Sequence, residues 1–282
     1  MTMEQRQDHE QARLWNGVAG AAWVELQATL DALFRPFETR LVAALADGAD
    51  QTVLDIGCGT GATALALAQC LGAGGQVLGI DISEPMIAHA QARTRHQRTR
   101  APVAFLCADA EHHAFEPGRF DRIVSRFGVM FFADPVAAFG NLRRAARAAA
   151  QLHLIAWRHP GENAFMTTAE RAAAPLLPAS PPRAPDAPGQ FAFADRARVR
   201  LLLEEAGWRD VAITPLDMEC RMPESALEPY FTRLGNLGRL WPSLAPDLRE
   251  RLIATVRPAF APFLRDGEVC FTAACWEIAA TA

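Results

Sequence analysis

The segment 53–61 runs Val53-Leu54-Asp55-Ile56-Gly57-Cys58-Gly59-Thr60-Gly61, an apolar run that leads into three glycines at alternate positions. The apolar run is typical of a buried parallel strand, and the small and apolar residues from Ala62 to Leu71 predict a helix after it. Glycines let a backbone turn tightly and approach a ligand closely. The free N–H groups at the start of the helix favour an anion such as a carboxylate or phosphate. This segment therefore predicts a strand–loop–helix unit with a ligand site at its turn.

The same alternation continues along the chain. Short apolar runs predict further strands at residues 76–80, 103–107, 120–124, 152–157, 211–213 and 269–278. Helical patterns separate most of them, at residues 83–95, 135–149 and 195–206. This order predicts an α/β fold, a doubly wound, seven-stranded and mostly parallel sheet of Rossmann-like type.

Acidic residues follow three successive strands. Asp55 precedes Gly57 by two positions, and the glycines have G-x-G-x-G spacing, not the G-x-G-x-x-G of dinucleotide sites. A carboxylate there repels a pyrophosphate and favours a cationic ligand such as a sulfonium or ammonium group. Asp81 ends the second strand, where an acid of doubly wound folds binds ribose hydroxyls. Asp109 follows the third strand, so all three acids are expected at the carboxyl edge, where such sheets bind ligands.

These motifs resemble those of the class I S-adenosylmethionine-dependent methyltransferases, in their small-molecule, ubiquinone/menaquinone-biosynthesis-like branch. Two further stretches carry the resemblance, Phe120-Asp121-Arg122-Ile123-Val124-Ser125 and Phe131-Phe132-Ala133-Asp134-Pro135. One departure is Ala148-Ala149-Ala150-Gln151, where the family usually has a Pro-Gly-Gly turn before the fifth strand. The resemblance implies a methyltransferase that transfers a methyl group from S-adenosylmethionine to a small-molecule acceptor.

The resemblance also implies which residues hold the cofactor. The Gly57–Gly61 loop would cradle its methionine part, and Asp81 would take the ribose hydroxyls. Ile82 and Met86 would flank the adenine, while Asp109 and Ala110 would bind its edge. The full set of expected cofactor residues is Asp55, Gly57, Gly59, Gly61, Asp81, Ile82, Met86, Asp109, Ala110, Ser125 and Trp23.

The acceptor side gives a weaker pattern. Methyl transfer from a sulfonium is an in-line displacement with an activated leaving group, so the protein mainly aligns the reactants and excludes water. A general base is optional, and the candidates for a catalytic role are Arg126, His159 and Glu162. The expected acceptor-binding residues follow strands four and five and are Arg126, Trp157, Arg158 and Asn163. Five apolar side chains either line a pocket or belong to the core: Phe127, Met130, Phe131, Phe132 and Trp241.

Segments outside the alternation predict helical additions to the sheet. A helical block between two strands cannot belong to the sheet, so we expect it to pack over the strand ends. The predicted division is an N-terminal helical lid (1–49), a cofactor-binding core (50–157), a cap segment with a proline-rich loop (158–200), a core helix and strand (201–219), a helical cap (220–265) and a C-terminal core strand (266–282).

Composition excludes several other classes of protein. The 282 residues carry a net charge of −4 and include no lysine, which excludes lysine-based chemistry and gives no basic field for nucleic acid. The six cysteines show no zinc-ligand spacing, so no metal is expected. The polar first residues and the lack of a long apolar run predict a cytoplasmic protein with no membrane partner, as a monomer or homodimer.

Alternative functions remain at this point. A nicotinamide-dependent oxidoreductase is disfavoured by the glycine spacing and by Asp55. A nucleic-acid methyltransferase is disfavoured by the net charge and by Ser125-Arg126-Phe127-Gly128, where an N/D-P-P-Y-type motif would be expected. A non-catalytic or differently liganded module with the same fold stays open, because methyl transfer leaves little trace in the sequence. The acceptor and the atom that is methylated are also open.

Overall fold

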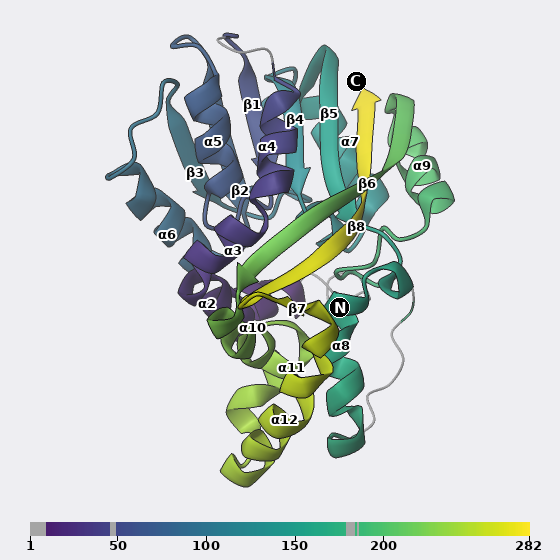
Figure 1. Cartoon of the computed structure of the whole chain (residues 1–282). Helices are drawn as coiled ribbons and strands as arrows, with labels where there is room; N and C mark the ends of the chain where they lie inside the picture. Colours follow the sequence, from purple (N-terminus) through teal and green to yellow (C-terminus); the bar gives the residue numbers. More distant parts are fainter. Residues whose placement is uncertain (1–9, 46–48, 179–183, 185) are drawn as a thin grey trace.

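One mixed sheet organises the chain in the computed structural model, which describes residues 10–45, 49–178, 184 and 186–282. The strand order is β3-β2-β1-β4-β5-β8-β6, and β7 pairs with β8 off this path (Figure 1). Strands β1 to β5 run parallel, whereas β8 is antiparallel to both β5 and β6. The strands are β1 Thr52–Ile56, β2 Gln76–Asp81, β3 Val103–Cys107, β4 Phe120–Arg126, β5 Ala146–Trp157, β6 Arg209–Pro223, β7 Leu264–Arg265 and β8 Glu268–Thr281.

This topology confirms the predicted doubly wound, mostly parallel sheet. Over the described residues the sheet has eight strands where seven were predicted, because the two-residue β7 is too short to leave a sequence pattern. All five residues of β1 are buried, as expected for a central strand covered on both faces.

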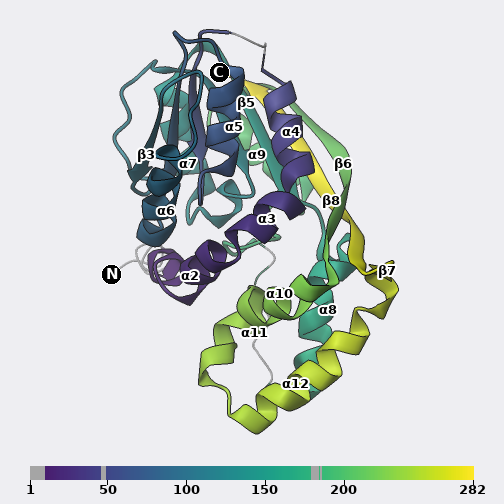
Figure 2. The ribbon, with the colours of Figure 1, turned by 60° about the vertical axis from the view of Figure 1, so that its left-hand side comes forward.

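Helices cover both faces of the sheet. On one face lie α4 (Arg35–Ala43), α5 (Ala62–Cys70) and α6 (Glu84–Thr94) (Figures 1 and 2). On the other face lie α7 (Pro135–Ala145) and α9 (Arg196–Glu205). Because α4 packs against α5 and the sheet, it belongs to this layer, although the sequence placed it in the N-terminal lid.

A second group of helices lies beyond the ends of the strands. We call α8 (Ala164–Ala173), α10 (Leu227–Arg233), α11 (Gly235–Leu240) and α12 (Pro246–Ala259) the cap helices. They gather at one end of the molecule (Figures 1 and 2). The chain reaches α8 from β5, whereas the long strands β6 and β8 lead to and from α10, α11 and α12. Phe165 of α8 stacks on Phe271 of β8 with ring centroids 3.9 Å apart, which ties the cap helices to the sheet.

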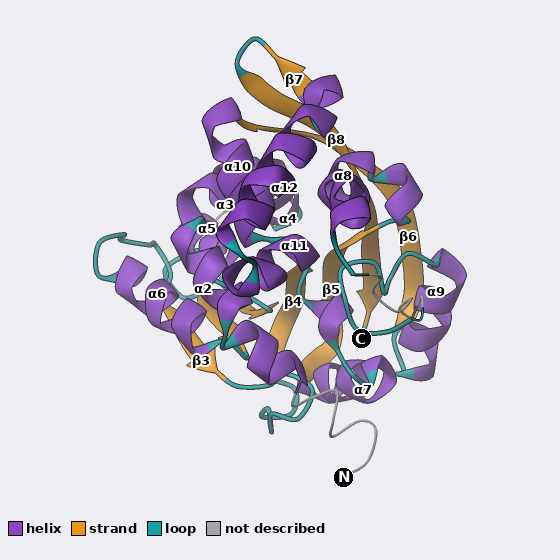
Figure 3. Cartoon of the chain, turned by 90° about the horizontal axis from the view of Figure 1, so that it is seen from below, coloured by secondary structure: helices purple, strands orange, loops and turns teal. Residues whose placement is uncertain are grey.

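The N-terminal helices α2 (Val18–Glu25) and α3 (Gln27–Leu33) lie between the sheet and the cap helices. α2 contacts both α6 and α11, so it bridges the two parts of the molecule. Seen from below, α2 and the cap helices lie in front of the ends of β4 and β5 (Figure 3).

Two predicted boundaries were wrong. The helix predicted over 135–149 ends at Ala145, and Ala146 already pairs with Phe120 of β4. A run of alanines gives no stop signal; the strand forms because of pairing with β4, and Ala149 takes a left-handed φ of 63° at the register shift. β6 is also longer than the predicted 211–213 and extends past residue 220, where a helical cap was predicted. Exposed residues interrupt its apolar pattern, so the sequence does not show the full strand, which forms because it pairs with β8.

Candidate functional site

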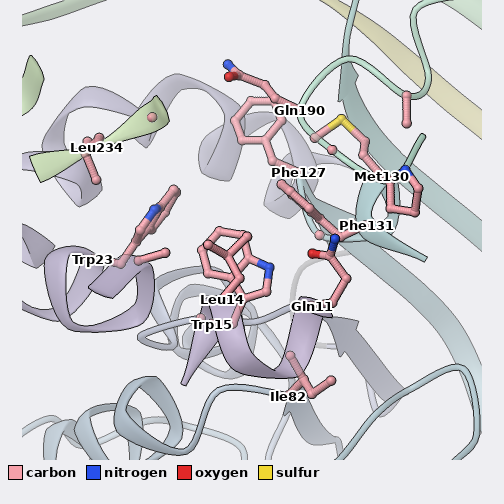
Figure 4. A pocket seen from close by; sticks show the side chains of 18 of the residues that line it. Gln11, Leu14, Trp15, Trp23, Ile82, Phe127, Met130, Phe131, Gln190 and Leu234 are labelled. Atoms are coloured by element: carbon pink, nitrogen blue, oxygen red, sulfur yellow. The ribbon is translucent and has the colours of Figure 1, made fainter. Parts of the chain in front are cut away.

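A large cavity lies at the carboxyl ends of β1 to β4, between the sheet, the N-terminal helices and the cap helices (Figure 4). Its volume is about 1360 Å³. The wall has three parts: the loops after the strands, residues 10–34 of the N-terminal segment, and residues from α8, α10, α11 and 187–192. Among the described residues no group of three or more His, Cys, Asp or Glu side chains could hold a metal ion.

The glycine loop after β1 forms one end of the cavity. Gly57, Gly59 and Gly61 all have left-handed φ angles, of 63°, 54° and 87°. A Cβ on Gly57 would lie 2.6 Å from the Gly128 Cα, so only glycine lets the loop pass the end of β4. Gly57 and Gly59 line the cavity, whereas Gly61 is the N-cap residue of α5.

Asp81 lies at the end of β2 and faces the cavity. Its Oδ2 accepts a hydrogen bond from the Gly59 N–H at 2.8 Å, and its Oδ1 accepts one from the Ser83 N–H at 2.9 Å. Burial raises the pKa of Asp81, and these two backbone hydrogen bonds oppose that effect. Each carboxylate oxygen can accept a further hydrogen bond. Asp81 therefore fits the pair of hydroxyls on a ribose.

Asp55 takes a different position from the one the sequence suggested. Its side chain is buried beneath the glycine loop and is absent from the described wall of the cavity. Burial raises its pKa to about 7, while the charge of Arg126 acts in the opposite direction. Its Oδ2 is buried and finds no hydrogen-bond partner in the described part of the chain. Asp55 can therefore affect a ligand only indirectly, through the electric field of its carboxyl group and through the position of the glycine loop.

The loops after β2 and β3 continue the wall. Ile82, Met86, Asp109 and Ala110, which the sequence assigned to the cofactor, all line the cavity. Ser125 does not: its Oγ donates to the Ile56 carbonyl at 2.8 Å and accepts from the Gly128 N–H at 3.2 Å. Ser125 thus fixes the end of β4 against β1.

Two of the predicted acceptor residues lie in the cavity wall. Arg126 lies 5.9 Å from the Phe34 ring centroid and donates to the Phe34 carbonyl at 3.3 Å. Burial lowers its pKa, and nearby carboxylates, led by that of Glu38, oppose this. Trp157 stacks on Phe127 with centroids 4.5 Å apart. Arg126 therefore places one positive charge beside aromatic walls.

The structure does not bring the other candidates to the cavity. Arg158 pairs with Glu162 at 2.7 Å and with Asp217 at 3.0 Å. The His159 Nδ1 accepts from the Gly161 N–H, and the Asn163 amide bonds both backbone groups of Ala274 at 2.9 Å. After Trp157 the chain turns along β8, so these residues hold the cap helices to the sheet.

The apolar candidates divide in a similar way. Phe127, Met130, Phe131 and Phe132 line the cavity, whereas Trp241 is absent from its described wall. Trp23, which the sequence assigned to the cofactor, also lines the cavity from α2, and its ring lies 6.4 Å from that of Phe34 (Figure 4).

Sequence reasoning missed much of the wall. From the N-terminal segment come Gln11, Leu14, Trp15 and Phe34, and from the cap side come Met166, Gln190, Tyr230, Arg233 and Leu234. Figure 4 labels Gln11, Leu14, Trp15, Gln190 and Leu234 among them. One signal was available: Tyr230 is the single tyrosine of a chain with 16 phenylalanines, so its hydroxyl is unusual. Its hydroxyl lies 3.1 Å from the Met166 sulfur, a weak acceptor.

The chain is similar to known methyltransferases. Residues 53–149 match a family described as "Methyltransferase domain". The nocamycin O-methyltransferase of Saccharothrix syringae is 28% identical over 78% of this chain and 81% of its own length. The demethylmenaquinone methyltransferase of Thermus thermophilus is 34% identical over 45% of this chain and 56% of its own length. The aklanonic acid methyltransferase DauC of a Streptomyces species is 34% identical over 38% of this chain and 49% of its own length.

The fold is shared with solved structures. The YcgJ protein from Bacillus subtilis covers 88% of this chain and 98% of its own, with a TM-score of 0.56 at 17% identity. The curated relatives include quinone methyltransferases, as the sequence predicted. The chain therefore carries a methyltransferase domain over residues 53–149 and is an S-adenosylmethionine-dependent methyltransferase.

Proposed function

We propose that the chain methylates an acidic oxygen of a small, partly apolar molecule that binds beneath the cap helices. The main support for this proposal is that one cavity has both a polar end, at the glycine loop, and an aromatic end, at Phe34, Phe127 and Trp157. Its volume of about 1360 Å³ exceeds the roughly 300–1,000 Å³ of a pocket for one drug-sized ligand. The cavity thus has room for a cofactor and an acceptor together.

The polar end is the proposed cofactor site. Asp81 would take the ribose hydroxyls with the lone pairs that Gly59 and Ser83 leave free. Ile82 and Met86 would flank the adenine, and Asp109 would bind its edge. When bound, S-adenosylmethionine supplies a methyl group on a sulfonium centre. The buried carboxyl of Asp55 and the aromatic faces nearby favour a cation over an anion there.

The aromatic end is the proposed acceptor site. An Arg guanidinium keeps its charge in proteins, so Arg126 would hold an acceptor oxygen in its anionic form. No histidine is present in the described wall, and an acceptor that is already acidic needs no strong base. Trp157 and Phe127 would exclude water and set the plane of the acceptor. The name of the Saccharothrix relative, an O-methyltransferase, supports oxygen as the methylated atom.

We extend the proposal to partners and location. All six cysteines are free thiols, which supports the reducing environment of a cytoplasm. Among the described helices none is long and apolar enough to cross a membrane. The net charge of −4 supports a small molecule over a nucleic acid as acceptor. The division into lid, core and cap made from the sequence also stays a proposal.

A calorimetric titration tests the cofactor site. S-adenosylhomocysteine should bind with micromolar affinity and NADH should not. Asp81→Ala should weaken binding about 100-fold or more, because hydrogen bonds to a charged group contribute about 1.5–3 kcal/mol each. Asp195→Ala is the matched control, since Asp195 also accepts two backbone N–H groups but lies at α9, outside the described wall. Equal binding of NADH, or no binding of S-adenosylhomocysteine, would overturn the proposal.

A further inference from the structure

The N-terminal segment is fastened to the loop after β2. The Ser83 Oγ donates to the Trp15 carbonyl at 2.6 Å. The Asn16 amide donates to the Ile82 carbonyl at 3.0 Å and accepts from the Glu84 N–H at 2.8 Å. These three hydrogen bonds join segments that lie far apart in the sequence. They fix helical residues 10–15 next to the loop proposed for the ribose and adenine.

Gln11 lies in this fastened helical turn. It precedes Trp15 by four residues, so the two side chains share one face of the helix. Both line the cavity, and Figure 4 shows Gln11 beside Phe131, with Leu14 and Trp15 next to it. The Trp15 ring meets the Phe131 ring edge-on at 5.1 Å, which limits where the neighbouring side chains can go.

The amide oxygen of Gln11 has no hydrogen-bond partner among the residues that the structure describes. The Oε1 atom is buried, and within the described ranges no donor forms a hydrogen bond to it. A buried, unbonded amide oxygen is unfavourable, so it marks a place where a ligand supplies the donor. The titratable groups near the cofactor end of the wall include the carboxyls of Asp81 and Asp109, which accept hydrogen bonds when ionised. A ligand that donates hydrogen bonds, through N–H or O–H groups, therefore fits this part of the wall.

We propose that Gln11 is a cofactor-binding residue of the N-terminal segment, whose amide oxygen accepts a hydrogen bond from an N–H group of S-adenosylmethionine. This inference rests on the proposed cofactor site. The cofactor has two such groups, the adenine amino group and the ammonium of its methionine part. Gln11 lies outside residues 53–149, so the match to the methyltransferase domain does not assign it.

Calorimetry on the full chain tests this role. Gln11→Met removes both polar atoms at similar volume and should weaken S-adenosylhomocysteine binding about 3- to 10-fold, the usual effect of one hydrogen bond. Gln11→Glu keeps an acceptor and should bind more tightly than Gln11→Met. Gln69→Met, at an exposed position of α5, is the control for the substitution itself. Methylthioadenosine, which lacks the ammonium, distinguishes the two N–H sources. If Gln11→Met weakens methylthioadenosine binding as much as it weakens S-adenosylhomocysteine binding, Gln11 accepts from the adenine amino group; if methylthioadenosine binding is unchanged, it accepts from the ammonium.

Thermal unfolding separates binding from folding. Without ligand, Gln11→Met should melt at or above the temperature of the unaltered protein, because it removes an unbonded buried oxygen. Its stabilisation by S-adenosylhomocysteine should be smaller. Equal affinities of the unaltered protein and Gln11→Met would overturn the inference while leaving the proposed function intact. Failure of the unaltered protein to bind S-adenosylhomocysteine would overturn both.

Discussion

The two ends of the cavity are built in different ways. The cofactor end consists of short loops after successive strands, and backbone groups such as the Gly59 and Ser83 N–H position its key carboxylate. The cap end consists of side chains from helices that lie far apart in the sequence, such as Met166 and Tyr230. The cofactor end therefore depends on backbone conformation, whereas the cap end depends on which side chains its helices present. Substitutions should therefore have large effects at the first end and graded effects at the second.

The largest effect should come from Gly57→Ala. The new Cβ would meet the Gly128 backbone at 2.6 Å, and the residue would have to keep a φ of 63°. Together the strain and the forced shift should lower the free energy of unfolding by about 2–4 kcal/mol, and S-adenosylhomocysteine binding should be lost. Urea denaturation and calorimetry measure the two effects.

A second glycine separates the causes of this loss. Gly118 has the same φ of 63°, but a Cβ there would meet no atom within 4 Å. Gly118→Ala should therefore lose only about 1–2 kcal/mol and bind normally. Equal losses in both variants would mean that the close approach to β4 has no role.

An intermediate effect is expected from Asp55→Asn, and it depends on pH. Burial raises the pKa of Asp55 to about 7 from the 3.8 that is usual for an aspartate, so the folded state holds a proton that the unfolded chain releases. Its contribution to stability is present at low pH and falls as the pH rises from about 4 to about 7, by at most about 1.4 kcal/mol per pH unit. The stability of Asp55→Asn relative to the unaltered protein should thus rise over this window and level off above pH 7. A flat difference in urea denaturation between pH 4.5 and 8 would contradict the buried position.

The smallest effect should come from Tyr230→Phe at the cap end. Burial raises the pKa of Tyr230, so its hydroxyl stays a donor, and among the described residues only the Met166 sulfur is shown to accept from it. We expect this hydroxyl to donate to an oxygen of the bound methyl acceptor, because the sulfur is only a weak hydrogen-bond acceptor. Loss of that hydrogen bond should raise the KM for an identified methyl acceptor about 3- to 10-fold, with S-adenosylhomocysteine affinity unchanged. Met166→Leu is the control, because it removes the sulfur and keeps the volume. An equal rise in KM for Met166→Leu would assign the effect to packing.

The same contrast explains what the sequence could predict. Strand, loop and helix lie next to one another from Thr52 to Cys70, so local pattern predicted both the fold and the loop. Asp81 and Asp109 followed from the rule that ligands bind at the carboxyl ends of such strands. These predictions were possible because the residues involved are close together in the sequence, or because a doubly wound sheet allows few other positions for a ligand site.

Other predictions failed because tertiary contacts decide them. Arg158 directly follows β5, and Asn163 comes after the short helical turn Pro160–Glu162, but pairing of β5 with β8 turns them toward Asp217 and Ala274. No local pattern shows that an asparagine amide will bond a backbone on a distant strand. Tyr230 lines the cavity only because of the way α10 packs against the rest of the molecule, and the sequence of α10 alone does not show that packing.

The pairing of β6 with β8 has a consequence for how acceptor choice could change. Pro223 and Glu268 are partners across these strands, and the Glu224 N–H donates to the Gly267 carbonyl at 3.0 Å. Residues 224–267 therefore leave and re-enter the sheet at one place, and an insertion with adjacent ends can be replaced without changing strand register. Evolution or a protein engineer can exchange this block, with α10, α11 and α12, as one unit. Such an exchange would change the acceptor side of the cavity and leave the cofactor-binding loops unchanged.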